Sequence, residues 1–335
     1  MKTYRAIEFS KLLFLLDETG QAFWDNKRLE YRDNPLTGKE GTNWWMHDSY
    51  KDDRRKVISH ICKNGKEQFF DTSLQYNAMQ GGRFNPSKSF GVIYSASSPM
   101  IAALEVLFHL FADSYPIYRG MSRSSSKISC SFNAKVPDKI QVIIPVFEMS
   151  LHKDFELYDL CSSLDALNSD CQKVGFKRYL GQKFSRDFIF GNDYEISRII
   201  GCHRHTQKVT AFKVPSARID FEIQDDLDHR NIIVPEKDFD EAKPKLTGKF
   251  VEFRCEIDMD PSSKHGHKVK LVGMGQNEEV AEFYLQPIPT KKHGDLQTIR
   301  YPPVNASKKD QDSYSRIVQV QKFYVPTPEE ETEEA

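Results

Sequence analysis

The stretch that decides the fold is residues 81–111, which reads GGRFNPSKSFGVIYSASSPMIAALEVLFHLF. Gly81-Gly82 marks a turn, and the apolar run at residues 90–94 predicts a short strand. Ser98-Pro99 supplies a favourable N-cap followed by a residue suited to the first helical position. We therefore predict a helix from Met100 to about Phe111. Its apolar face would comprise Ile101, Leu104, Phe108 and Phe111.

Three polar side chains in this stretch are candidates for chemistry. Arg83 follows a double glycine, so the backbone can approach a ligand closely and the guanidinium can bind a phosphate through two hydrogen bonds. Tyr94 closes the strand, where its ring can stack on a planar heterocycle. Glu105 lies at the edge of the apolar helix face and needs either a partner or a chemical role. A structural pairing with a core arginine and a catalytic role are both open for it.

The segments before residue 81 are less regular. Thr3–Ile7 predicts a strand, and a short apolar helix follows it. Residues 18–75 are polar and aromatic, which favours irregular cover with one or two short helices, one of them at Lys56–Cys62. Trp44 and Trp45 are more typical of core than of pocket lining.

Strands and helices alternate in the middle of the chain. Helices are expected within Leu157–Leu180 and at Tyr194–Ile200. Val214-Pro215-Ser216-Ala217-Arg218 ends an alternating segment, where a strand presents side chains at a cleft; an ordinary strand end with Arg218 in solvent is the alternative. Strands are expected at Lys127–Phe132, Ile140–Val146, Val209–Val214 and Asn231–Pro235.

A change in composition at Pro235–Lys249 separates the last part of the chain. Four patterned segments follow it, which predicts a small all-β module or extra strands on the first domain. We divide the chain into residues 1–235, a β-rich module at 236–325 and an acidic tail at 326–335. This tail holds five glutamates and is expected to be disordered. The four segments are Phe250–Met259, Lys268–Val272, Val280–Leu285 and Ile317–Val325.

Composition excludes several classes of protein. The 335 residues carry 47 basic and 48 acidic side chains, so no overall positive charge attracts nucleic acid. The longest purely apolar run, Leu12–Leu16, is far too short to span a membrane. Six scattered cysteines favour reduced thiols and a cytoplasmic location. Cys202–His205 and His265–His267 do not complete a metal-ligand set, so we expect no metal.

The motifs together resemble the RES domain, a family named after its arginine, glutamate and serine. The resemblance rests on Gly82–Pro86, Tyr94–Pro99, Ala103–Leu107 and Val214–Arg218, with Tyr4-Arg5-Ala6 similar to the opening strand and Asn231 before a later strand. It implies an α+β fold: a mixed α/β domain like that of ADP-ribosyltransferases, built on a split sheet that binds NAD⁺. Two segments depart from the compact family pattern, a long insertion at about 18–80 and the extension after residue 235.

The resemblance also implies roles for six residues. Glu105 would be the catalytic carboxylate, and Ser216 would hold the nicotinamide ribose or orient Glu105. Arg83 would bind the pyrophosphate or the adjoining ribose, and Tyr94 would pack against the nicotinamide. Weaker candidates for NAD⁺ contacts are Arg5 and Asn231.

The implied activity is breakdown of NAD⁺ at the nicotinamide–ribose bond, by a glycohydrolase or a phosphorylase. NAD⁺ would be the substrate and no metal would be needed. Compact family members are bacterial toxins of toxin–antitoxin pairs, so a role as toxin or defence effector follows, with an antitoxin or immunity protein as partner. One alternative is a protein ADP-ribosyltransferase with a protein acceptor. Another is a non-catalytic interaction protein of the same fold. Neither a nucleic acid nor a membrane is expected as partner.

Overall fold

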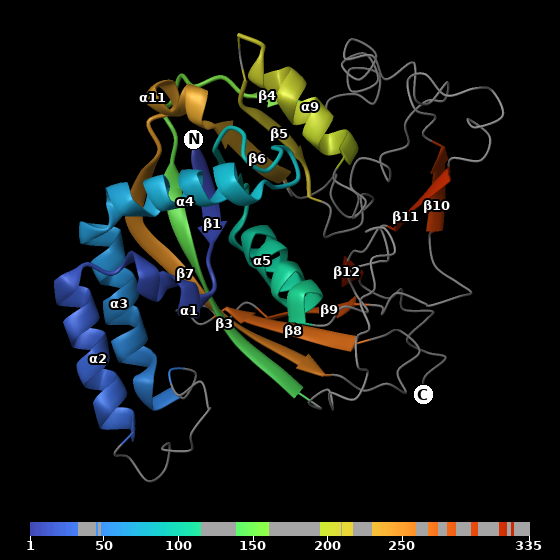
Figure 1. Cartoon of the computed structure of the whole chain (residues 1–335). Coiled ribbons are helices and arrows are strands. Elements are labelled where there is room, and N and C mark those ends of the chain that lie inside the picture. Colours follow the sequence, from blue (N-terminus) through green and yellow to red (C-terminus); the bar gives the residue numbers. More distant parts are fainter. Residues whose placement is uncertain are drawn as a thin grey trace.

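The computed structural model describes residues 1–32, 45, 48–114, 139–160, 195–208, 210–216, 230–258, 267–273, 280–285, 296–300, 315–319 and 323–324. Figure 1 shows helices packed against a long, twisted sheet. The helices are α1 (Phe9–Leu12), η1 (Leu13–Leu15), α2 (Glu18–Arg32), η3 (Asp48–Tyr50), α3 (Lys51–Asn64), α4 (Lys66–Gln80), α5 (Pro99–Ser114), α9 (Glu195–His205), η5 (Glu236–Asp238) and α11 (Phe239–Ala242). The strands are β1 (Lys2–Ala6), β2 (Val92–Ala96), β3 (Lys139–Ser150), β4 (Tyr158–Asp159), β5 (Phe212–Pro215), β6 (Arg230–Pro235), β7 (Lys245–Asp258), β8 (His267–Gly273), β9 (Val280–Leu285), β10 (Leu296–Arg300), β11 (Ser315–Gln319) and β12 (Phe323–Tyr324).

The central sheet has a weak joint between β1 and β2. Its ten described strands run in the order β12-β9-β8-β7-β3-β1-β2-β6-β5-β4, and only β4 and β5 pair in parallel. β1 pairs with β3 over five residues but with β2 through Tyr4 and Ala96 alone. The sheet therefore consists of two halves joined at one point. The mixed α/β architecture agrees with the expected α+β class, while the split sheet and the likeness to ADP-ribosyltransferases stay predictions.

Each face of the sheet has its own hydrophobic core. Neighbouring residues of β3 project to opposite faces, so Phe147 joins the core beneath α1, α3 and α4, whereas Val146 joins the core beneath α5. α5 contacts β1, β2, β3, β6 and β7, which places it across the joint between the two halves.

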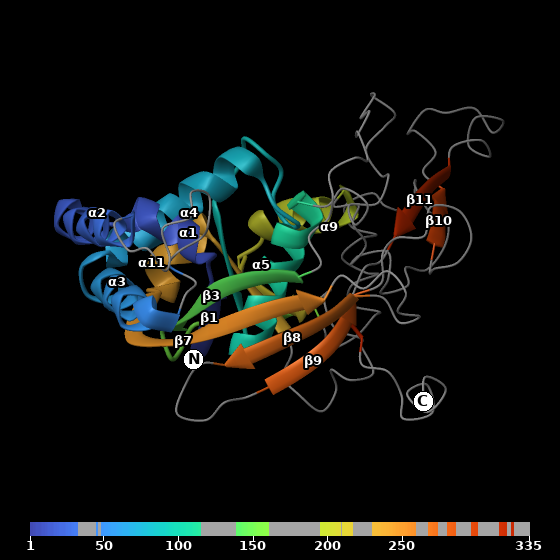
Figure 2. The same ribbon diagram turned by 90° about the horizontal axis from the view of Figure 1, so that it is seen from below.

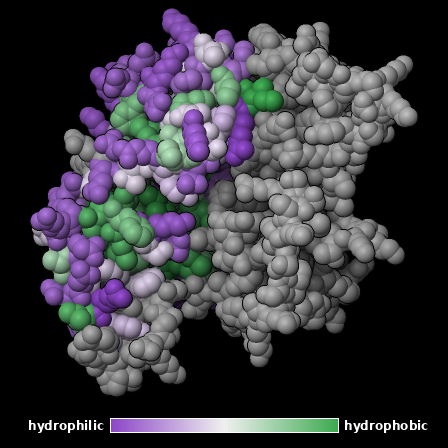
Figure 3. All heavy atoms as spheres, in the orientation of Figure 1, coloured by the Kyte–Doolittle hydropathy of each residue, from purple (hydrophilic) through white to green (hydrophobic). Residues whose placement is uncertain are grey.

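The segment between residues 18 and 80 differs from the prediction of irregular cover. It forms three helices of 14 or 15 residues, α2, α3 and α4. Each buries a narrow face and exposes polar side chains, and hydrophilic residues cover most of the described surface in Figure 3. Because most residues of these helices are polar, the apolar spacing that indicates a helix is weak in this part of the sequence. Trp45 packs against Phe9 and Trp24, as expected of a core residue; Trp44 lies outside the described residues.

Of the two arrangements predicted after residue 235, the structure shows extra strands on the first domain for β7, β8, β9 and β12. β7 pairs with β3 from Lys139↔Asp258 to Ser150↔Lys245, and β8, β9 and β12 extend the same sheet. Figure 2 shows β7, β8 and β9 side by side beyond β3. The physical reason is that β3 would otherwise be an edge strand with unpaired backbone groups. β10 and β11 form a two-stranded sheet of their own.

A buried ion pair connects the helical segment at residues 18–80 with the strands after residue 235. The Arg54 guanidinium on α3 donates to Glu252 Oε1 on β7 from Nε at 3.0 Å and from Nη2 at 2.9 Å. Both side chains are completely buried. Arg54 also donates to the Trp45 carbonyl. The pair therefore ties the helical insertion to the first strand of the extension.

The remaining predictions have mixed outcomes. Ten elements lie close to the predicted strands and helices: β1, α1, β2, α5, β3, α9, β5, β6, β8 and β9. Tyr158–Asp159 is the strand β4 rather than the start of a helix, because it pairs with β5. Among the helices that the structure describes, none has the length and apolar character needed to cross a membrane. The strand expected at 127–132, the helix expected at 161–180 and the acidic tail lie outside the described residues.

Candidate active site

Glu105 projects from α5 toward the half of the sheet that contains β2, β6 and β5. The helix begins at Pro99, and the Ser98 hydroxyl accepts a hydrogen bond from the Ile101 amide, as an N-cap does. Glu105 is half-buried. Its Oε1 accepts one hydrogen bond from the Ser216 hydroxyl at 2.9 Å and another from Asn231 Nδ2 at 2.7 Å. Two donors on one oxygen fix the orientation of the carboxylate.

Sheet register brings these partners together. Asn231 pairs with Ala96 of β2 on one side and with Val214 of β5 on the other. Paired residues project to the same face, and Ala96 belongs to the core beneath α5, so Asn231 points toward that helix. Ser216 follows β5 two residues after Val214. The cluster of Glu105, Ser216 and Asn231 thus combines side chains that are more than 110 residues apart in sequence.

Tyr94 projects to the same face and holds the loop that carries Arg83. Its hydroxyl donates to Asn85 Oδ1 at 2.8 Å and accepts a hydrogen bond from the Phe84 amide at 2.9 Å. Asn85 is completely buried, and its Nδ2 donates to the carbonyls of Asn77 and Phe90. The structure thus gives the Tyr94 hydroxyl a supporting function, while packing against nicotinamide stays a prediction.

Arg83 lies in this loop, residues 81–91, which we call the arginine loop. Its side chain is 8% exposed. Gly82 precedes it, and a Cβ at that position would lie 2.7 Å from the Tyr94 hydroxyl oxygen. Glycine is therefore required for the loop to approach β2 this closely. Arg83 is connected to the Glu105 cluster through Tyr94 and β2.

Arg5 bridges the joint between the two halves of the sheet. Its Nη1 donates to the Tyr94 carbonyl at 2.6 Å, so the side chain of β1 contacts the backbone of β2 next to their single paired position. Burial lowers the pKa of the Arg5 guanidinium to about 10, which leaves it charged at neutral pH. Its Nε is buried and has no hydrogen-bond partner among the described residues.

Sequence analysis missed the support that α9 gives to the arginine loop. Arg198 Nε donates to the Gly82 carbonyl at 2.9 Å. A Cβ at Gly201 would lie 1.7 Å from the Phe84 carbonyl oxygen, so the helix and the loop are in backbone contact there. Arg198 and Gly201 are three residues apart and share a helix face, but this spacing does not indicate which segment that face contacts. Asn85 belongs to the Gly82–Pro86 motif, but the sequence alone indicates no role for it.

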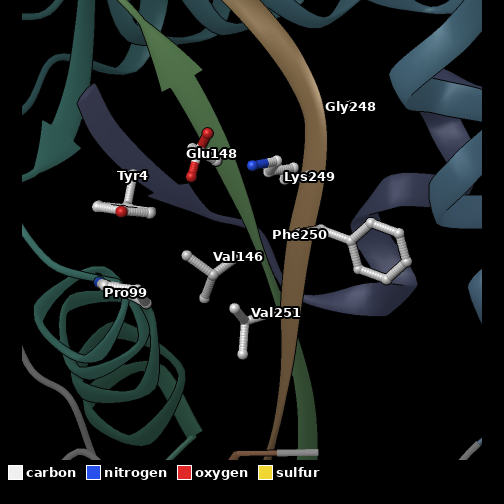
Figure 4. A pocket seen from close by; sticks show the side chains of 8 residues that line it. All are labelled: Tyr4, Pro99, Val146, Glu148, Gly248, Lys249, Phe250 and Val251. Carbon is white, nitrogen blue, oxygen red and sulfur yellow. The ribbon is translucent and has the colours of Figure 1, made fainter. Parts of the chain in front are cut away.

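A cavity of about 490 Å³ lies on the same sheet face, near the start of α5. Figure 4 shows Tyr4, Glu148 and Lys249 around it, while the Phe250 ring points to the opposite side of β7. None of the six predicted site residues lines this cavity. Glu148 is already paired with Lys2 at 3.5 Å. This cavity therefore contains none of the residues that the sequence predicts to carry the chemistry.

The family comparison agrees with this geometry. The sequence model of the RES domain matches residues 59–249. The chain therefore belongs to the RES domain family, which is associated with enzymes that act on NAD. Glu105, Ser216, Asn231, Tyr94 and Arg83 all lie inside the matched range, and Arg5 lies before it. A search of curated proteins gives no match to the chain.

The structure thus brings together three of the six predicted residues, Glu105, Ser216 and Asn231, in direct contact. Tyr94 lies on β2, two residues before the partner of Asn231, and projects to the same sheet face. Arg5 donates to the Tyr94 carbonyl, and the Tyr94 hydroxyl holds the arginine loop that contains Arg83. Within the part of the chain that the structure describes, no group of three or more His, Cys, Asp or Glu side chains has the arrangement of a metal site.

Proposed function

We propose that this protein degrades NAD⁺ by cleaving the bond between nicotinamide and ribose, as a glycohydrolase or a phosphorylase. The observation that carries the proposal is the Glu105 carboxylate, held by Ser216 and Asn231 on the sheet face that also presents Tyr94. A role as toxin or defence effector would follow from removal of a central cofactor from the cell.

The residue types suit the reaction. As the glycosidic bond breaks, its electrons leave with nicotinamide, which departs as a neutral molecule, and positive charge develops on the ribose. A fixed carboxylate near that ribose stabilises the charge without having to reorient. Water as acceptor gives ADP-ribose, nicotinamide and a proton; inorganic phosphate gives the 1-phosphate of ADP-ribose and nicotinamide. Ser216 and Asn231 would keep Glu105 oriented in either case.

The two arginines suit the other end of the substrate. Arg5 is half-buried, and its buried Nε has no hydrogen-bond partner among the described residues. A buried donor of this kind is costly unless a ligand or a water satisfies it. Arg83 lies in the arginine loop on the other side of Tyr94. Guanidinium groups bind phosphate oxygens well, which supports a place for the NAD⁺ pyrophosphate at Arg83. Arg5 pairs with Phe147 and therefore projects from the sheet face opposite Glu105, so it is the weaker candidate for this contact.

The test is NAD⁺ turnover by the purified protein, with and without phosphate, beside the Glu105→Gln variant. We expect turnover to fall at least about 100-fold, because a group that stabilises charge in the transition state is lost. Glu148→Gln is the matched control, since that carboxylate lies on the same sheet face at the cavity of Figure 4. Turnover that survives in Glu105→Gln would contradict the proposal, and labelling of added protein without release of free product would favour the ADP-ribosyltransferase.

A further inference from the structure

Helix α9 presents one face to the arginine loop. Arg198 contacts the Gly82 carbonyl, Gly201 contacts the Phe84 carbonyl, and the His205 ring stacks on Phe90 with 4.0 Å between centroids and 5° between planes. Positions 198, 201 and 205 are three and four residues apart, so they form one stripe along the helix. The residues of this stripe contact the arginine loop at Gly82, Phe84 and Phe90, which is most of its length.

The neighbouring face of α9 is anchored in the protein. Ser197, Ile200 and Arg204 are buried, again at spacings of three and four residues. The Arg204 guanidinium lies 3.8 Å from the centre of the Tyr158 ring on β4. α9 is therefore attached to the β4 edge of the sheet as well as to the arginine loop.

The contacts of α9 bracket Arg83. The Gly82 carbonyl belongs to the peptide group before Arg83, and the Phe84 carbonyl follows it, so α9 touches the backbone on both sides of this residue. On the sheet side, the Tyr94 hydroxyl holds the Phe84 amide. We propose that Arg198 is a positioning residue that orients the backbone at Arg83 for NAD⁺ binding. The part that concerns NAD⁺ rests on the proposed function.

The first test is a double-mutant cycle with Arg198→Ala and Arg83→Ala, measured as KM and kcat for NAD⁺. Loss of a hydrogen bond from a charged donor should raise KM about tenfold and change kcat little. In the Arg83→Ala background, Arg198→Ala should add no further loss, because the two residues act through one contact. Arg198→Lys should recover part of the affinity. His203→Ala is the control on the same helix. An unchanged KM, or equal losses in both backgrounds, would overturn the proposal.

The second test measures the loop without NAD⁺. The amides of Gly82, Phe84 and Gly91 all donate hydrogen bonds within or next to the loop, to Asn85, Tyr94 and Glu236. Their hydrogen exchange should be at least about tenfold faster in Arg198→Ala than in the wild-type protein or in His203→Ala. A wild-type protein that does not consume NAD⁺ would end the proposed function, while faster exchange would still support the positioning of the loop. Unchanged exchange would overturn the inference even in an active enzyme.

Discussion

At the scale of single residues, Ser216 and Asn231 are expected to act through Glu105. Ser216→Ala and Asn231→Ala each remove one donor to Oε1. Because hydrogen bonds to charged groups contribute about 1.5–3 kcal/mol, each change should lower kcat about 10- to 100-fold and alter KM less. Steady-state kinetics measures both constants, and thermal unfolding checks that the variants are folded. An unchanged kcat in both variants would contradict this account of the site.

Tyr94 offers a second prediction at this scale, because its hydroxyl and its ring serve different purposes. Tyr94→Phe keeps the ring but leaves the Phe84 amide and Asn85 Oδ1 without the hydroxyl. We expect the free energy of unfolding to fall by about 1–3 kcal/mol, measured by urea denaturation. Tyr76→Phe is the control, since that side chain is 63% exposed. Equal stability of both variants would show that the hydroxyl does not support the arginine loop.

At the scale of elements, His205 makes the contact between α9 and the arginine loop sensitive to pH. Burial, and then the nearby Lys237, lower the pKa of His205 below 6.5, although Glu236 and Asp238 oppose this. The unfolded chain therefore binds the proton more readily, so folding stability is complete above pH 6.5 and falls as the pH drops toward the lowered pKa. His205→Phe keeps a ring against Phe90 and removes the titration.

The measurement is the free energy of unfolding at several values between pH 8 and pH 5. The wild-type protein should lose more stability over this range than His205→Phe does. His203→Phe serves as the control, because residue 203 lies on α9 outside the stripe that faces the loop. If His205→Phe and the wild-type protein show the same dependence on pH, the stacked pair has no part in it.

The elements also show what sequence can and cannot reveal. α5 was predictable because Ser98-Pro99 is a local signal, and the contact between Ser216 and Glu105 followed from the family resemblance. The helix predicted at Lys56–Cys62 is part of α3, but α2, α4 and the full length of α3 were not predicted, since each helix buries a narrow stripe within a polar sequence. The contact of Arg198 with Gly82 joins residues 116 positions apart, and no local pattern encodes such a pairing. After residue 235 the sequence left open a separate β module or extra strands on the first domain, because strand patterning does not specify the partner strand. The sheet order shows the second arrangement for β7, β8, β9 and β12.

At the scale of the whole molecule, the Arg54–Glu252 pair joins the segments on either side of the family match. The match begins at residue 59 and ends at residue 249, so both members of the pair lie just outside it. Glu252→Leu leaves the Arg54 cation buried without this carboxylate, which should cost about 3–5 kcal/mol of the free energy of unfolding. The double variant Arg54→Met/Glu252→Leu should recover most of the loss.

Urea denaturation of the three proteins measures these values. Glu148→Ala is the control, because its partner Lys2 is 63% exposed and such surface pairs contribute less than about 1 kcal/mol. If Glu252→Leu lowers the free energy of unfolding as little as the control does, α3 and β7 are held together by apolar packing alone.

The separation of the site residues along the chain has a consequence for biosynthesis. Asn231 follows Glu105 by 126 residues, and the five-residue pairing of β1 needs β3, which also follows Glu105. At typical rates of about 5–20 residues per second, a ribosome needs roughly 6–25 s to advance from Glu105 to Asn231. During that time the nascent chain already contains Glu105 and the arginine loop but lacks a donor that orients the carboxylate. The candidate site therefore cannot be complete until Asn231 has been added to the growing chain.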